Sequence, residues 1–336
     1  MVTLGIRYDL RNPSFAGTTM QERYDAALEQ IAWADRLGFS SVTLSEHHGV
    51  DDGYLPSLFP FAAAVAAQTR SIRIRLGALI VPLHDPLRVA EDAAVVDLLS
   101  HGRLEIVLAN GYVAGEFAMF GRELGDRVRL VTEAFAVLRR AWTGEVFDFR
   151  GRSVRITPCP AHPGGPPLLL GGSSAGAARR AARIADGFVP ALPGLWDEYR
   201  DELRLLGRAD PGEVPPGGPM YLHVSHDPDA AWEQIAPHAM YEMNAYGAWA
   251  AESGSATGFA PISDPAVLRS MGLYRMLTPA QSIEMINGLG PRGHVTFHPM
   301  MGGVAPALAW ENLSLFETDV LPHLDRHRDS QGRNPR

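Results

Sequence analysis

The stretch GFSSVTLSEHHG, residues 38–49, contains a complete transition from helix to strand to loop. Gly38 follows an amphipathic run and stands where a glycine that ends a helix belongs. The next residues, SVTLS, are apolar and β-branched, as is typical of a short buried strand. The strand then ends in Glu46, His47 and His48, three titratable side chains in a row. The stretch therefore predicts a buried strand that carries polar groups to one edge of a sheet.

Short apolar strands alternate with amphipathic helical segments along almost the whole chain. The pattern predicts eight strands, at 3–8, 41–45, 72–81, 103–109, 167–172, 187–192, 219–225 and 293–299. Eight such units predict an α/β protein with a (β/α)8 TIM barrel, one domain over residues 1–326 with insertions before strand five and before strand eight. Residues 144–167 are typical of a polar hairpin and loop, and residues 245–275 of a mobile flap. We expect residues 327–336 to be a disordered tail.

A doubly wound sheet that binds a dinucleotide is the competing architecture. The chain contains one G-x-G-x-x-G, the stretch GLGPRG at 288–293, but this follows a helical pattern and precedes a strand. The dinucleotide fingerprint needs the opposite order, and Pro291 removes a backbone N–H that a phosphate would use. The match therefore does not predict a dinucleotide site.

The composition excludes several classes of function. All 30 basic residues are arginine, so Schiff-base enzymes and P-loops that depend on lysine are excluded. A net charge of −8 offers no basic field to nucleic acid, and no apolar run approaches the length of a membrane span. The N-terminal residues do not resemble a signal peptide, and the single Cys159 cannot form an internal disulfide. These features predict a cytoplasmic protein.

In a parallel barrel the carboxyl ends of the strands meet at one face, where active sites lie. The titratable triplet follows strand two at this face, and Asn110, Gly111 and Tyr112 follow strand four in the same way. Asp97 and Arg103 instead lie in a turn from helix to strand, at the opposite face. We therefore expect Asp97 and Arg103 to form a structural pair rather than to take part in catalysis.

A glycine turn follows strand five in the stretch LLLGGSSAGAARRAARIADG. Ser173 or Ser174 is a natural N-cap for the helix that comes next, and Gly171 and Gly172 allow a ligand to approach the backbone closely. The free N–H groups of a first helical turn bind anions well. The spacing fits a phosphate site for a nucleotide or flavin and equally fits an ordinary capped helix after a tight turn.

The two adjacent histidines allow three interpretations. A metal site would need further ligands, and the nearest candidates are His84 and Asp85 after strand three. Alternatively one histidine is a general base or hydrogen-bond donor in a cofactor pocket, supported by the other. Both could instead be polar groups at the rim of the barrel. The residues alone favour the second interpretation slightly over the third.

Four stretches in order resemble the luciferase-like flavin-dependent monooxygenases, the family that contains the bacterial luciferase α subunit. They are GFSSVTLSEHHG, HDPLRVAEDAAVVDLLSHGRLEIVLANGYVAGEFAMFG, LLLGGSSAGAARRAARIADG and MGGVAPALAWENLSLFETDVLPHL, and they span nearly the whole chain. The resemblance implies a (β/α)8 barrel, usually a homodimer, that binds reduced FMN or a deazaflavin at the C-terminal face of the strands.

The resemblance also implies roles for individual residues. His47 would act near the reactive edge of the flavin, with His48 beside it and Glu46 as an orienting neighbour. The turn after strand five would hold the flavin phosphate, and the segment after strand four would pack along the ring. A non-proline cis peptide is expected within residues 78–80. The implied cofactor-binding residues are Ala78, Leu79, Ile80, Asn110, Gly111, Tyr112, Gly171, Gly172, Ser173, Ser174 and Gly176.

The sequence departs from luciferase after strand four, where Ala109 and Asn110 replace a reactive cysteine and a phosphate-binding arginine. The luciferase substrate and light emission are therefore not expected. The resemblance implies oxygenation of a small, hydrophobic metabolite by O2 through a flavin C4a-hydroperoxide, without a metal. Because the chain contains no dinucleotide fingerprint, we expect a separate flavin reductase to supply reduced FMN. The alternatives are a deazaflavin-dependent oxidoreductase that transfers hydride and a flavin-binding protein without catalytic activity.

Overall fold

The computed structural model describes residues 2–254 and 258–324. Its strands are β1 (Thr3–Tyr8), β2 (Ser41–Leu44), β3 (Arg73–Leu79), β4 (Leu104–Leu108), β5 (Phe147–Phe149), β6 (Arg152–Val154), β7 (Leu168–Gly172), β8 (Gly187–Pro190), β9 (Tyr221–Val224), β10 (Tyr274–Leu277) and β11 (His294–Phe297). Its α-helices are α1 (Met20–Arg36), α2 (Leu58–Gln68), α3 (Pro86–Leu99), α4 (Ala114–Met119), α5 (Arg127–Ala141), α6 (Ala175–Ile184), α7 (Leu195–Leu205), α8 (Pro228–Ser253), α9 (Pro265–Ser270), α10 (Pro279–Gly288) and α11 (Pro306–Leu315). The expected tail at 327–336 and residues 255–257 of the expected flap lie outside the described residues.

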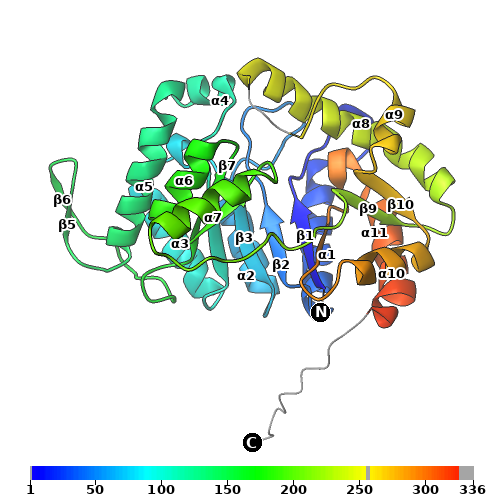
Figure 1. Cartoon of the computed structure of the whole chain (residues 1–336), viewed down its shortest axis with the longest axis horizontal. Coiled ribbons are helices and arrows are strands. Elements are labelled where there is room, and N and C mark those ends of the chain that lie inside the picture. The colour runs from blue at the N-terminus through cyan, green and yellow to red at the C-terminus, as the bar shows by residue number, and fades with distance from the viewer. Residues whose placement is uncertain (1, 255–257, 325–336) are drawn as a thin grey trace, which may run out of the picture.

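Seven parallel strands form one curled sheet in the order β11-β1-β2-β3-β4-β7-β8, with helices packed around it (Figure 1). All five residues of β4 are buried, because helices cover one side of the sheet and the barrel interior lies on the other. Gly38 and Gly102 have φ values of +80° and +78°, which confirms that both end helices just before a strand. Each of the eight expected strands corresponds to a strand of the structure, with ends that differ by a few residues.

Strand β10 was not expected from the sequence. It pairs in parallel with β9, and the segment before β9 approaches β11 through the N–H of Gly218, which donates to the carbonyl of His294. The strand has only four residues, and the side chain of Arg275 points to solvent. Such a short run carries little periodic signal. The first part of the expected flap is also regular, since α8 continues to Ser253.

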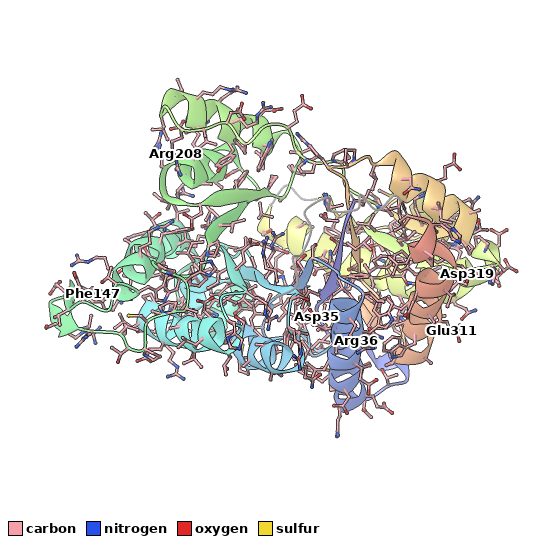
Figure 2. All side chains as sticks on the ribbon, turned by 90° about the horizontal axis from the view of Figure 1, so that it is seen from below. Asp35, Arg36, Phe147, Arg208, Glu311 and Asp319 are labelled. Carbon is pink, nitrogen blue, oxygen red and sulfur yellow. The ribbon has the colours of Figure 1, made fainter. Side chains whose placement is uncertain are left out.

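The carboxyl ends of the strands lie at the upper side of Figure 1, where α4 and the long α8 come together. At the lower side, seen directly in Figure 2, Asp35 lies near the end of α1. Its carboxylate accepts hydrogen bonds from the backbone N–H groups of Arg70, Ser71 and Ile72 at 2.6–2.9 Å. Asp35 thereby ties α1 to the start of β3. Figure 2 also shows Phe147 of the β5–β6 hairpin at the far edge of the molecule.

Arg103 and Asp97 are both structural, but they do not pair with each other. The guanidinium of Arg103 donates to carbonyl groups of Ala66, Thr69, Ile72 and Ser100. Asp97 instead accepts the N–H of His162 at 2.9 Å. The expected ion pair is therefore wrong, because backbone carbonyls at the turn use the guanidinium. None of the helices in the described ranges has the length and apolar character needed to cross a membrane.

Candidate active site

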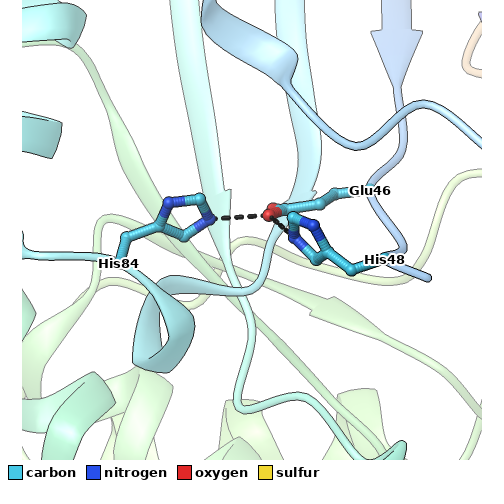
Figure 3. A group of neighbouring side chains, drawn as sticks. All are labelled: Glu46, His48 and His84. Carbon is cyan, nitrogen blue, oxygen red and sulfur yellow. Dashed lines mark hydrogen bonds and ion pairs between the residues drawn. The ribbon is translucent and has the colours of Figure 1, made fainter. Parts of the chain in front are cut away.

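Glu46, His47 and His48 leave the end of β2 in alternating directions, as successive side chains of an extended segment do. Glu46 and His48 lie on one side, where Nε2 of His48 is 2.6 Å from Oε1 of Glu46 (Figure 3). His47 lies on the other side and contacts Glu116. The structure thus differs from the expectation that Glu46 orients His47. The triplet divides between two separate clusters.

Glu46 is the centre of the first cluster, which joins the ends of β2 and β3. Its Oε1 accepts hydrogen bonds from Nε2 of His48 and Nε2 of His84, both at 2.6 Å, and its Oε2 accepts the N–H of Ile80 at 2.8 Å. Burial alone would raise the pKa of Glu46, but the hydrogen bonds from the two imidazoles lower it to about 2. Glu46 is therefore an ionised and fully hydrogen-bonded anchor.

Within the part of the chain that the structure describes, two groups of side chains have the composition of a metal site. The ligand atoms of Glu46, His48 and His84 lie within 4.8 Å of one another, as do those of Asp9, Glu242 and His298. In the first group these atoms already bond to each other, so the geometry is one of hydrogen-bonded support. In the second group Arg7 lies 3.6 Å from Glu242. A nearby cation disfavours a divalent ion there.

His47 has a defined orientation because Glu116 binds its ring. Nδ1 of His47 lies 2.7 Å from Oε1 of Glu116, and the same oxygen accepts the backbone N–H of His48 at 2.9 Å. A carboxylate accepts hydrogen bonds but cannot donate them, so Nδ1 carries a proton and Nε2 of a neutral His47 is left as an acceptor. Glu116 lies in α4, is 2% exposed and belongs to the loop region that follows β4.

Aromatic rings enclose the other faces of His47. The ring of Trp249 stacks on the imidazole with a centroid distance of 4.4 Å, and Tyr54 meets it edge-on at 4.9 Å. Tyr112 and Tyr246 lie at 5.9 and 6.2 Å. Tyr246 and Trp249 come from the end of α8, so this helix covers the mouth of the barrel above β2. The enclosure excludes water from the histidine, which is 7% exposed.

The expected cofactor segments after β3, β4 and β7 lie beside one another. Gly111 has a φ of +72°, and a Cβ there would lie 2.6 Å from Cγ2 of Ile80. A Cβ on Gly171 would lie 3.3 Å from Val107 of β4. In the residue before Gly111, Oδ1 of Asn110 is buried and has no hydrogen-bond partner among the described residues. The three strand ends therefore pack closely together at these glycines, with an unpaired acceptor at Asn110.

The segment at the end of β3 contains a cis peptide between Gly77 and Ala78, at the edge of the expected window. Ala78 is partly exposed, whereas Leu79 is 1% exposed and belongs to the main core. Ile80 packs in a small cluster with Leu83 and Phe117. Only Ala78 of the three expected residues therefore has a side chain open to a ligand.

Ser174 is the N-cap of α6, and its hydroxyl accepts the N–H of Ala177 at 3.2 Å. Ser173 is exposed beside it. A Cβ on Gly172 would lie only 2.4 Å from Cβ of Ala177, so glycine is required there by packing. Gly176 is different, because a Cβ would meet nothing closer than Oγ of Ser174 at 3.9 Å. The turn therefore presents the backbone of a capped helix start to the face that carries His47.

Glu116, Trp249 and Arg11 are site residues that the sequence did not predict. Glu116 stands in AGEFAMF, where one acidic residue interrupts an apolar run after strand four, and this is a usable signal. Trp249 lay in a segment expected to be a flap, so its side chain had no predicted place. Arg11 follows strand one without any motif, and only the fold brings it to the site.

A family model described as luciferase-like monooxygenase matches residues 9–266, which is more than half of the chain. The chain belongs to the luciferase-like monooxygenase family. The family is the one predicted from four stretches of sequence, and it accounts for the α/β barrel with helices outside the sheet.

Several similar proteins are named as monooxygenases or as an oxygenase component. The oxygenase component of flavin-dependent trigonelline monooxygenase from Acinetobacter baylyi is 24% identical over 69% of this chain and 67% of its own length. The 4-hydroxyprotoasukamycin monooxygenase of Streptomyces nodosus subsp. asukaensis is 30% identical over 66% of this chain and 64% of its own. A third relative, an uncharacterised protein of Sinorhizobium fredii, is matched over only 38% of its length. The chain thus spans between about one third and two thirds of these relatives.

Solved structures share the fold. Monooxygenase RslO1 from Streptomyces bottropensis superposes with a TM-score of 0.76 at 22% identity, covering 96% of this chain and 99% of the other. The oxygenating constituent of 3,6-diketocamphane monooxygenase from Pseudomonas putida, solved with FMN, gives 0.73 at 18% identity, with the same coverage. A coenzyme F420-dependent secondary alcohol dehydrogenase gives 0.66 at 18%. These likenesses confirm the predicted TIM-barrel fold.

Proposed function

We propose that the protein is an FMN-dependent monooxygenase that oxygenates a small, conjugated or hydrophobic organic compound with O2. The observation that carries the proposal is the pair His47–Glu116, which holds one imidazole in a fixed tautomer inside an aromatic enclosure at the catalytic face. Monooxygenase chemistry needs a site that excludes water and a group that moves or holds a proton beside the cofactor. Both requirements are met by residues of this chain.

The residues present fit a flavin. Gly111 and Gly172 let the backbone of two strand exits pack closely against Ile80 and Ala177, and the start of α6 offers backbone N–H groups to a phosphate. The unpaired Oδ1 of Asn110 is an acceptor for a ring N–H. Asn110 replaces the arginine of luciferase, so phosphate affinity comes from the helix start and from Ser173 and Ser174. Ala78, at the cis peptide, is partly exposed at the end of β3.

Each residue then has a distinct part in the proposed reaction. Reduced FMN supplies the electrons that activate O2. His47, with Nε2 as its free acceptor, takes or holds a proton at the reacting edge. Glu116 fixes the ring and stabilises it when it is protonated. Glu46 holds His48 and His84, and so supports the shape of the loop from which His47 projects.

We further propose that a separate reductase delivers reduced FMN, that the protein is cytoplasmic and that it forms a homodimer. The relative from Acinetobacter baylyi is named as an oxygenase component, which supports a two-component system. Val95, Leu98 and Leu99 of α3 are 41–49% exposed, and such an apolar helix face supports self-association. Light scattering after gel filtration measures the mass in solution.

Stopped-flow mixing tests the cofactor and the reaction. The protein is mixed anaerobically with reduced FMN and then with O2, and the absorbance is followed against reduced FMN alone. We expect a transient species, distinct from oxidised and reduced FMN, that decays far more slowly than free reduced FMN is oxidised. His47→Ala should bind FMN but shorten the life of this species, with His323→Ala, at a distant position, as the matched control.

A parallel mixing with reduced deazaflavin separates the alternatives. Deazaflavin is a hydride donor that is stable to oxygen, so tight binding of it with no transient species from FMN would overturn the monooxygenase proposal. A different outcome is that the wild type and His47→Ala bind FMN equally and that in both the reduced FMN is oxidised at the rate of free reduced FMN. This result would indicate a flavin-binding protein without catalysis.

A further inference from the structure

Arg11 is a buried cation in which two of the three side-chain nitrogens have no hydrogen-bond partner among the described residues. It follows β1 at the catalytic face and is 0% exposed. One nitrogen, NH1, donates to Oδ2 of Asp52 at 2.7 Å. Nε and NH2 have no hydrogen-bond partner within residues 2–254 and 258–324. These two nitrogens form one edge of the guanidinium, whose parallel N–H groups match two neighbouring oxygen atoms.

Arg103 shows what a purely structural arginine looks like in the same fold. Its Nε donates to the carbonyl of Ser100, and both terminal nitrogens donate to backbone carbonyls or to the hydroxyl of Thr69. Every nitrogen of Arg103 therefore has a partner. The unused edge of Arg11 is a departure from this pattern and from the general rule that buried donors are paired.

Aromatic rings surround Arg11 and connect it to His47. The guanidinium carbon lies 4.7–4.9 Å from the ring centroids of Tyr54, Tyr246 and Trp249. The same three rings contact the imidazole of His47. A flat molecule that takes the place of, or inserts between, the two rings from α8 would therefore lie beside His47 with one end at Arg11.

Two acidic groups lie beside Arg11: Asp52, which accepts the hydrogen bond from NH1, and Asp9, whose Oδ2 has no hydrogen-bond partner among the described residues. Oδ1 of Asp9 accepts the backbone N–H of Arg11 at 3.2 Å, while its Oδ2 lies 3.8 Å from Nε of Arg11 and 3.5 Å from Nε2 of His298. The other nitrogen of His298 lies 3.3 Å from Glu242. Burial alone lowers the pKa of Arg11, but Tyr246, Asp9 and Asp52 raise it, so the guanidinium stays charged.

We propose that Arg11 is the substrate anchor of the site, and that the substrate is a flat conjugated molecule with two neighbouring oxygen acceptors at one end, of which a carboxylate is the simplest case. The oxygens bind the free edge of Arg11, and the conjugated part lies among Tyr54, Tyr246 and Trp249. The inference rests on the proposed function for the chemistry that follows, but the binding itself does not depend on it. Because Arg11 is fully buried, binding requires the end of α8 to move.

Titration calorimetry with two matched probes tests the anchor. The ligands are 2-naphthoate and 2-naphthamide, which share shape but differ in the second acceptor oxygen, and the protein is used with and without saturating oxidised FMN. We expect 2-naphthoate to bind at least about tenfold more tightly, since a site built for a hydrogen bond rejects an analogue that lacks it. Arg11→Lys keeps the charge but loses the paired edge, and should remove most of this preference. Arg103→Lys serves as the control and should keep the preference.

Equal affinity for the two probes in the wild-type protein would overturn the inference, whatever the variants do. So would a folded Arg11→Lys protein, checked by circular dichroism, that retains the full preference for 2-naphthoate. The protein could prefer 2-naphthoate and yet have no effect on the oxidation of reduced FMN. This result would support Arg11 as the substrate anchor and contradict the proposed monooxygenase activity. The two proposals therefore fail separately.

Discussion

Nδ1 of His47 lies 2.7 Å from Oε1 of Glu116, although 69 positions separate the two residues in the chain. The contact joins the end of β2 to α4, and it fixes which nitrogen of His47 is free to react. The pairing of a histidine with a buried carboxylate is a device by which proteins set the tautomer and the basicity of an imidazole.

Replacing Glu116 with glutamine should lower turnover by about tenfold or more while FMN affinity changes little, because an amide can hydrogen-bond either tautomer of His47. Steady-state oxygen consumption and FMN fluorescence titration measure the two quantities. Glu123→Gln, an exposed glutamate in the same connection, should behave as wild type. Unchanged turnover in Glu116→Gln would show that the carboxylate does not position the histidine.

Replacing Asp35 with asparagine should destabilise the fold by about 1–3 kcal/mol at neutral pH, because the amide cannot accept all the bonds from the start of β3. Burial alone would raise the pKa of Asp35, but hydrogen bonds from Arg70, Ser71 and Ile72 lower it. The ionised carboxylate of Asp35 therefore stabilises the protein fully at pH values above the ordinary pKa of an aspartate. This contribution is lost as the pH falls from that value through the lower pKa of Asp35 in the folded protein.

Urea unfolding at pH 7 and at pH 3.5 measures both effects of the Asp35 substitution. The loss of stability on acidification should be smaller in Asp35→Asn than in the wild type. Asp25→Asn, an exposed change on the same helix, should follow the wild-type curve. A variant of Asp35 with wild-type stability at pH 7 would contradict the role assigned to its carboxylate.

Gly172→Ala and Gly176→Ala should differ sharply although Gly172 ends β7 and Gly176 lies only four residues later, in the first turn of α6. The new methyl group at position 172 meets Cβ of Ala177 at 2.4 Å, whereas at position 176 it meets open space. We expect Gly172→Ala to lose about 1–3 kcal/mol of stability and to weaken FMN binding, because the turn must shift. Gly176→Ala should keep both properties. Thermal unfolding and FMN titration of the pair settle the matter, and equal behaviour would refute the packing argument.

Trp249→Ala should increase uncoupling, in which O2 is reduced to hydrogen peroxide without oxygenation of the substrate. The indole stacks on His47 at 4.4 Å and removes one face of it from water, so its loss admits water to the reacting edge. The fraction of consumed O2 that appears as hydrogen peroxide is the quantity to measure. Trp196→Ala, on the distant α7, provides the control. A wild-type fraction in Trp249→Ala would mean that the indole does not shield the site.

The strands were predictable because each buried run of β1, β4 and β7 is bounded by a glycine or a polar turn. Strand β10 was not, since four residues with an exposed Arg275 give no period to detect. The end of α8 was also missed: Gly and Ser in this part of the chain suggested a flap, but the buried Met243, Gly247 and Ala250 pack the end of the helix against the rest of the protein. Tertiary packing overrides local propensity in such cases.

For the candidate site, the positions of the strand ends in the sequence were enough to predict which residues lie at the same face. His47, Asn110 and Ser174 could be assigned to one face because a parallel barrel places every strand exit there. Their partners could not be assigned, because Glu116 and Trp249 lie on helices whose rotation only the packed structure defines. The free edge of Arg11 could not be predicted either, because the sequence does not show which hydrogen-bond donors lack a partner in the folded protein.

The opposite directions of His47 and His48 have a consequence for mutational scanning. The side chains of these two neighbours belong to different networks, one ending at Glu116 and the other at Glu46 and His84, although the backbone N–H of His48 also donates to Glu116. Because a substitution leaves that backbone bond in place, losses caused by changing each side chain should come close to adding in free energy when both are changed. A scan that replaces both histidines together would therefore combine the loss of the proposed proton-handling group, His47, with the loss of a structural hydrogen bond between His48 and Glu46.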